Sequence, residues 1–253
     1  MSATINQIYD LLKAIAPLEL AEPWDNPGLL AGRGEAEVDA VLCALDLTLQ
    51  VIDEAVRLGA GLIVTHHPIL FRGRKNLRED DAEGRMLCAL IRANLGLIAM
   101  HTNFDNASPG VNDALAARLG LRDVEALENG MRIGYTDNTT FARFAARVEE
   151  RLGGSVRCYG DADAPIRRVA VLGGAGEDFA AQAIAAGADC YVTGEMAYHK
   201  GLDAAADGLT VIEAGHAATE RPGILALSAA LQSAADAVQY KVRVIDSEAR
   251  LCL

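Results

Sequence analysis

The chain has 253 residues and a formal net charge of −12, and 51% of its residues are hydrophobic. That is enough apolar material for a sizeable core, in one large domain or two small ones. The longest basic stretch spans only residues 72–75. A surface that tracks nucleic-acid phosphates needs clustered basic side chains, so nucleic-acid binding is disfavoured.

Cysteine usage and the N-terminus indicate the compartment. The five cysteines are widely spaced and form no CxxC pair: Cys43, Cys88, Cys158, Cys190 and Cys252. An odd number without framework spacing is typical of a reducing compartment. The N-terminal segment lacks the basic start and unbroken apolar stretch of a signal peptide, and no segment approaches the ~20 apolar residues of a membrane span. We therefore expect a soluble, cytoplasmic protein with no membrane partner.

Short apolar runs alternate with amphipathic stretches along the chain. Buried strands are predicted at residues 38–45, 61–65, 95–100, 168–172, 190–193 and 209–212. Helices, marked by apolar residues three and four apart, are predicted at 49–58, 82–93, 111–119, 141–152 and 179–186. Strands that alternate with helices predict an α/β fold with mainly parallel or mixed sheets.

An internal repeat divides the chain. Residues 169–193 repeat the strand–helix–strand pattern of residues 41–65 without a gap, at a displacement of 128 positions (169 minus 41). Any two such units look broadly alike, but the shared Gly-Ala and Val-Thr pairs favour a duplication. We predict two similar, duplicated α/β lobes. The first spans 1–125 and is completed by the C-terminal segment 220–253; the second spans 126–219.

A cluster of polar side chains follows each predicted strand. The clusters contain Asp46 and Thr48; His66 and His67; His101 and Asp105; residues 173–176; Glu195; and His216 and Glu220. The carboxyl ends of parallel strands share one edge of a sheet, which is where open α/β folds place their sites. Four of the five histidines lie in or beside these clusters, and the fifth, His199, follows Glu195 by four residues.

The adjacent pair His66-His67 is the sharpest local feature. Neighbouring side chains on an extended segment point in opposite directions, so each imidazole could serve a different metal ion. The alternative is one buried and one exposed histidine, each satisfied by backbone groups. For an isolated pair of histidines, that alternative is the more common outcome.

Two histidine–carboxylate pairs favour a metal site over that alternative. His101 and Asp105, like His216 and Glu220, are four residues apart, so on a helical turn each pair can converge on one point. Imidazole and carboxylate ligands suit zinc, iron(II) and manganese. A helix-capping acid beside an unrelated histidine explains either pair alone. Three such groups at the strand ends of one sheet favour a metal site.

The chain carries a set of motifs in a characteristic order. They are WDNPGLLAG (24–32), LDLT (45–48), THHPILF (65–71), HTNFD (101–105), VTGE (192–195) and EAGHAATERPGI (213–224). With them the chain resembles, over its whole length, the GTP cyclohydrolase I type 2 homologues, also called dinuclear metal-centre or Nif-three-like proteins. It corresponds to their short form, which has no extra domain between the two halves.

The resemblance implies two divalent metal ions per chain, such as zinc, iron or manganese, in the cleft between the duplicated lobes. By motif, His66, Asp105 and Glu220 would hold one ion. His67 and His216 would hold the other, and Glu220 would bridge the pair. The resemblance also implies a homo-oligomer, a toroidal hexamer.

Three further residues are candidates for proton transfer. His101 could be a direct ligand, a donor that orients Asp105, or a proton carrier, and we favour a role other than primary ligand. Glu195 and His199 could face the ions, or they could be a helix-capping acid and a solvated histidine. Trp24 precedes a Pro-Gly turn on which it is expected to pack, whereas the resemblance implies a place for it near the cleft.

The leading functional hypothesis is a metal-dependent hydrolase, GTP cyclohydrolase type 2-like, that acts on a small-molecule substrate such as a nucleotide. Two ions that share a water lower its pKa and stabilise the oxyanion that forms. The alternative is a non-catalytic metal-binding protein with a regulatory or storage role. A nucleic-acid-binding module conflicts with the net charge of −12. The basic residues Arg72 and Arg74 are better explained as solvated charges than as contacts to a substrate phosphate.

Overall fold

A computed structural model describes residues 2–249 of the chain. Cys252 and the last residues of the predicted segment 220–253 lie outside this part. The chain forms two compact units. The first combines the described residues of Met1–Ala107 and of Ile224–Leu253, and the second is Ser108–Gly223.

The first unit contains a five-stranded sheet. Its strands are β2 (Gly28–Ala31), β4 (Ala40–Ala44), β5 (Leu62–Thr65), β6 (Gly96–Ala99) and β13 (Arg243–Asp246), in the order β13-β4-β5-β6-β2. Only β2 is antiparallel to its neighbour. The helices are α1 (Ile5–Ile15), α2 (Leu49–Leu58), α3 (Ala82–Arg92) and α4 (Thr102–Asp105), with the 3-10 turn η1 (Leu18–Leu20). A two-stranded ladder joins β1 (Ala3–Thr4) to β3 (Glu37–Val38).

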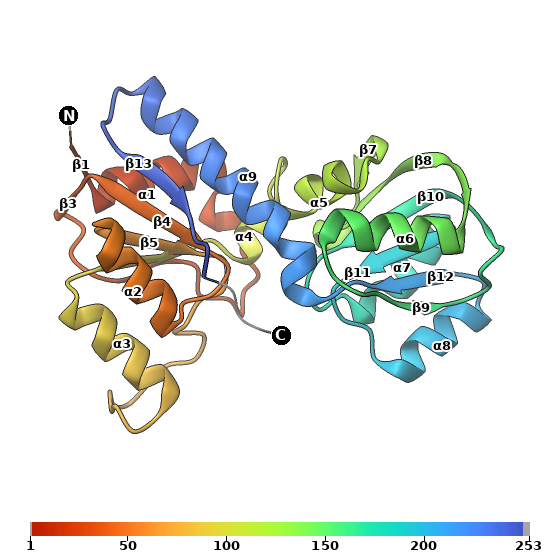
Figure 1. Cartoon of the computed structure of the whole chain (residues 1–253), viewed down its shortest axis with the longest axis horizontal. Coiled ribbons are helices and arrows are strands. Elements are labelled where there is room, and N and C mark those ends of the chain that lie inside the picture. The colour runs from red at the N-terminus through yellow and green to blue at the C-terminus, as the bar shows by residue number, and fades with distance from the viewer. Residues whose placement is uncertain (1, 250–253) are drawn as a thin grey trace. The chain divides into compact units, whose positions relative to one another are not determined.

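Helices cover both faces of this sheet (Figure 1). On one face, Leu42 and Ile63 pack with Ile52 of α2 and Leu90 of α3 in a buried cluster. On the other lie α1 and α9 (His216–Ala237), a helix that begins in the second unit and belongs to the first from residue 224 onward. All four β5 residues are buried, as a strand enclosed on both faces requires.

The second unit contains a six-stranded sheet. Its strands are β7 (Arg122–Ala126), β8 (Arg132–Thr140), β9 (Arg157–Tyr159), β10 (Pro165–Leu172), β11 (Cys190–Thr193) and β12 (Thr210–Glu213), in the order β7-β8-β10-β11-β12-β9. The central strands β10, β11 and β12 are parallel, and the others pair antiparallel. The helices are α5 (Val111–Leu119), α6 (Phe141–Leu152), α7 (Ala180–Ala185) and α8 (Tyr198–Ala206), with the 3-10 turns η2 (Glu128–Gly130) and η3 (Glu177–Phe179).

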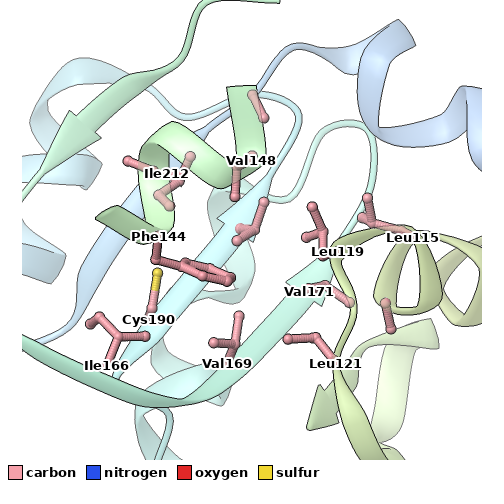
Figure 2. Close-up of a cluster of buried hydrophobic side chains, with 14 of the residues drawn as sticks. Leu115, Leu119, Leu121, Phe144, Val148, Ile166, Val169, Val171, Cys190 and Ile212 are labelled. Carbon is pink, nitrogen blue, oxygen red and sulfur yellow. The ribbon is translucent and has the colours of Figure 1, made fainter. Parts of the chain in front are cut away.

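The core of the second unit lies between its sheet and helices α5 and α6. Figure 2 shows Phe144 of α6 close to Cys190, among the side chains of α5 and the sheet. Burial of each large apolar side chain contributes roughly 1.5–3 kcal/mol. Burial also raises the pKa of the Cys190 thiol to about 12, so the group stays neutral and acts as a small hydrophobe. The opposite face packs against α7 and α8 around Tyr191.

The two units have the same arrangement of strands around their parallel core. In the first, Val41 pairs with Leu62, and in the second Val169 pairs with Cys190, which is the same register at the displacement of 128 positions. Each parallel trio, β4-β5-β6 or β10-β11-β12, is followed by an antiparallel edge strand, β2 or β9. The predicted α/β class with mainly parallel or mixed sheets is confirmed. Within residues 2–249, no helix is long and apolar enough to span a membrane.

Candidate metal centre

Parallel pairing brings the first group of polar side chains to one sheet edge. His66 and His67 directly follow β5, and His101 stands at the N-cap position of α4, two residues after β6. The amide of Met100 donates to the carbonyl of Thr65 at 2.9 Å, which extends the ladder to this edge. The local geometry therefore follows from the two strands ending side by side.

Three imidazoles gather at this edge. His66, His67 and His101 each offer a ligand atom, and these atoms lie within 4.8 Å of one another, so the group could hold a metal ion. The ring centroid of His66 lies 4.9 Å from that of His67 and 5.1 Å from that of His101. His66 is fully buried, while the other two side chains keep partial access to solvent. The carboxylate of Asp105 adds an oxygen 3.6 Å from His66 Nε2.

Oxygen acceptors hold one nitrogen of each adjacent histidine. His66 Nδ1 donates to the carbonyl of Met100 at 2.8 Å. His67 Nδ1 donates to the carboxylate of Asp46 at 2.8 Å. This pattern assigns the proton of each ring to Nδ1, so that Nε2 is the atom that could offer a lone pair to a metal ion. A histidine that binds a metal ion through one ring nitrogen usually donates from the other ring nitrogen to an oxygen acceptor of this kind.

His101 has a carboxylate partner as well, and that partner is Asp25. His101 Nδ1 donates to Asp25 Oδ1 at 2.8 Å, and the backbone amide of Thr102 donates to Asp25 Oδ2 at 3.0 Å. Burial raises the pKa of Asp25, but the hydrogen bonds from His101 and Thr102 outweigh it and lower the pKa to about 2. Asp25 is therefore ionised at neutral pH and fixes the His101 ring.

A second group of candidate ligands lies in the second unit. His216 and Glu220 occupy the first turn and a half of α9, and His216 Nε2 lies 3.1 Å from Glu220 Oε1. His216 Nδ1 donates to Glu195, which follows β11, at 2.9 Å. The four-residue spacing thus brings the imidazole and carboxylate together on one helix face, with Glu195 as the outer carboxylate.

A glycine turn after β10 lies against this pair. A Cβ atom on Gly174 would stand 2.3 Å from Glu220 Oε1 and 3.2 Å from His216 Nε2. The φ of Gly174 is +67°, a backbone conformation that favours glycine. The turn is held by Asn112, whose buried side chain accepts from the amide of Gly173 at 2.7 Å. Any residue with a Cβ atom at position 174 would crowd the side chains of Glu220 and His216.

Two residues of the candidate centre, Asp46 and Asp25, had no predicted role. Asp46 stood in a polar cluster after a strand, which was a usable signal that received no role. Asp25 belongs to the motif WDNPGLLAG, which was a usable signal, but no predicted strand or helix contains it and the sequence did not show that it would meet His101. His199 lies exposed at the start of α8 beside the ring of Tyr198, at 5.3 Å between centroids. Its catalytic role stays a prediction.

Comparison with known proteins identifies the family. A family model described as Duf34/NIF3 (NGG1p interacting factor 3) matches residues 3–250. The chain belongs to the Duf34/NIF3 family. Proteins named "GTP cyclohydrolase 1 type 2 homolog" are among its relatives. That of Clostridium acetobutylicum is 35% identical and the match covers 92% of this chain and 91% of the relative. That of Streptomyces coelicolor is 36% identical, with 95% and 90% covered.

A solved structure supports the same assignment. The crystal structure of a Bacillus cereus protein related to NIF3 is similar at a TM-score of 0.93 and 27% identity, over 98% of this chain and 97% of that one. The family resemblance inferred from the motifs is confirmed, and so is the fold class of the Duf34/NIF3 chain.

Proposed function

We propose that the chain binds two divalent metal ions through His66, His67 and Asp105 of the first unit and His216 and Glu220 of the second. In the proposed arrangement, Glu220 serves both ions. The donor set is imidazole nitrogen and carboxylate oxygen, which suits zinc, iron or manganese. The observation that carries the proposal is the adjacent pair His66 and His67, each with Nδ1 held by an oxygen acceptor, and the carboxylate of Asp105 3.6 Å from His66 Nε2.

The activity that we propose is hydrolysis of a small-molecule substrate such as a nucleotide. A bound divalent cation supplies Lewis acidity and lowers the pKa of water. His101 is then the residue of this chain best prepared to move a proton, because Asp25 holds its Nδ1 and leaves Nε2 as the exchanging atom. The carboxylate of Glu195 orients His216 and has less freedom to act as an independent base.

The test is metal content measured together with turnover. Wild-type protein is loaded with defined metals, and its hydrolysis of GTP and of a panel of phosphoesters is compared with that of Glu220→Gln and His66→Ala. Glu150→Gln, an exposed carboxylate of α6, serves as the matched control. We expect Glu220→Gln to lose metal from both positions and to lose activity, and His66→Ala to lose occupancy while staying folded.

The outcomes separate the two functional hypotheses. Activity that is unchanged in Glu220→Gln would eliminate the metal mechanism. Two ions retained per chain in that variant would refute its bridging role. Metal binding without turnover of any substrate would favour the non-catalytic alternative.

We also propose a homo-oligomer, a hexamer by the resemblance of the motifs. Light scattering that gives the monomer mass of 26.7 kDa would contradict this proposal.

A further inference from the structure

The only tryptophan of the chain is exposed on a rigidly held turn. Trp24 has 58% of its surface accessible. The two residues that follow it are held by contacts outside the turn: Asp25 accepts from His101 Nδ1, and the side-chain amide of Asn26 donates to the carbonyl of Leu70 at 2.6 Å. From the residue pattern we predict that Trp24 packs on its own turn. A large indole held in the open by fixed neighbours instead suggests a surface that another molecule covers.

Two more rings extend this surface toward the imidazole group. The ring centroid of Trp24 lies 5.8 Å from that of Phe71 and 6.2 Å from that of His101. Phe71 is 43% exposed and lies 6.4 Å from His101. These separations are those of interacting aromatic pairs. An aromatic surface therefore adjoins one of the three histidines that could hold a metal ion.

A basic pocket continues from the same loop. It has a volume of about 520 Å³ and is lined by Asn26, Leu70, Phe71, Arg72, Gly73 and Arg74. Its size lies in the range of small-molecule sites, about 300–1,000 Å³. Phe71 belongs both to the aromatic surface and to the pocket lining.

The two arginines of the pocket differ in their charge balance. Arg74 is paired with Asp81 and Glu83, each at 2.7 Å, so its charge is offset. For Arg72, no ion pair or side-chain hydrogen bond is found within the part of the chain that the structure describes, and the residue is exposed. In a chain with a net charge of −12, Arg72 is thus a local cation that an anionic group could meet.

We propose that Trp24, Phe71 and Arg72 form a recognition surface for a planar aromatic ring that carries an anionic group. The ring stacks on the exposed faces of Trp24 and Phe71, and the anion meets the guanidinium of Arg72. The ligand is then held beside His101. This inference deepens the proposed function, on which it rests for its biological meaning, because it names the residues that select the substrate.

The single tryptophan makes the proposal directly measurable. Indole emission of the wild-type chain is titrated with adenosine 5′-monophosphate, adenosine and ribose 5-phosphate, with metal content measured in the same metal-free and metal-loaded samples. We expect saturable quenching by adenosine 5′-monophosphate and adenosine, which contain an aromatic ring, and none by ribose 5-phosphate, which does not. An indole emission that no ring ligand changes would overturn the proposal. So would emission that changes only with chain concentration, because a second copy would then cover Trp24.

Variants test each contact by equilibrium dialysis of the nucleotide. Arg72→Gln should weaken binding of the monophosphate about 10-fold and leave adenosine binding nearly unchanged. Arg78→Gln, an arginine of the same segment that is paired with Asp80, is the matched control. Trp24→Ala should weaken nucleotide binding about 10-fold, and Trp24→Phe should bind with most of the wild-type affinity. Equal losses for the monophosphate and adenosine in Arg72→Gln would refute the role of Arg72.

The failure of this inference is distinguishable from the failure of the proposed function. Ring binding by a chain that takes up no metal would uphold the surface and refute the metal centre. Metal uptake without ring binding would refute the surface alone.

Discussion

At the scale of single residues, the notable feature of the candidate centre is the oxygen atom that accepts a hydrogen bond from Nδ1 of each imidazole. Asp46 holds His67, Asp25 holds His101, and Glu195 holds His216. Such partners fix the ring orientation and the tautomer, and they raise the basicity of the other ring nitrogen. The affinity of the centre should therefore depend on carboxylates that would not themselves touch the metal.

Asp46→Asn tests this dependence. The amide can still accept a hydrogen bond, but it carries no charge and can present its NH₂ group to the ring instead, so we expect metal affinity to fall about 10- to 100-fold with the fold intact. Competition with a metal chelator measures the affinity, and circular dichroism measures the fold. Asp39→Asn, an exposed acid just before β4, is the control. An affinity within twofold of wild type would argue against an orienting role for Asp46.

Glu54 shows a different use of a buried carboxylate. It lies on α2 and is only 8% exposed. Its oxygens accept from the Ser247 hydroxyl and from the backbone amides of Glu248 and Ala249, the latter two at 3.1 and 3.3 Å. Burial raises the pKa of Glu54, but these hydrogen bonds outweigh it and hold the pKa below its ordinary value of 4.5. The carboxylate thus fastens the segment after β13 to α2.

The depressed pKa of Glu54 gives a pH dependence with a defined sign. Since the folded state favours the ionised form, the stabilisation is fully present above the unfolded pKa near 4.5 and is lost as the pH falls through the lower folded pKa. Glu54→Gln should lower the free energy of unfolding by about 2 kcal/mol at neutral pH, and the deficit should shrink in acid. Urea unfolding at several pH values measures it, with the exposed Asp53→Asn as the control. A deficit that does not change with pH would show that the charge is not responsible.

At the scale of secondary-structure elements, apolar runs and strand-end clusters predicted the parallel trios of both sheets. They did not predict β8, the nine-residue strand at the centre of the antiparallel part. This strand is not a continuous apolar run, and it begins with Arg132, which is only 2% exposed. Arg132 is tolerated there because Asp113 of α5 pairs with it at 2.8 Å. A contact made across 19 residues left no periodic signal in the sequence.

The turn after β10 provides the test at this scale. Gly174→Ala should displace the Glu220 carboxylate, which a Cβ would meet at 2.3 Å, and it should also strain a backbone at φ +67°. We expect lost metal binding and a destabilisation of about 1 kcal/mol. Gly153→Ala is the matched control, because its φ of +79° imposes similar strain while no atom lies within 4 Å of the added Cβ.

Isothermal titration with metal and thermal unfolding of both variants separate the two effects. Metal binding lost equally in Gly153→Ala would attribute the loss to general instability instead of to contact with Glu220.

At the scale of the whole molecule, we expect the chain to fold without metal and to bind metal in the folded state. Each unit has its own buried apolar core, so chelation should leave the circular dichroism of the protein unchanged. Metal added at about 100 times its dissociation constant should then stabilise the chain by about 2.7 kcal/mol. Thermal unfolding with and without a chelator measures this. Loss of secondary structure on chelation alone would mean that the site is structural.

The sequence by itself determined the α/β class, the duplicated strand–helix–strand pattern, the family and the histidine–carboxylate motifs. These are local or periodic properties, and chain spacing records them directly. For example, the four residues between His216 and Glu220 place both on one face of any helix.

Only the tertiary structure determined which oxygen atom accepts a hydrogen bond from each imidazole. Asp25 meets His101 across 76 positions of the chain, and Asp46 meets His67 across 21. Both contacts arise because segments that are distant in sequence meet at one edge of a sheet, and a single sequence does not encode that adjacency in any repeating pattern. The same reason explains why the exposure of Trp24 became visible only in the folded chain.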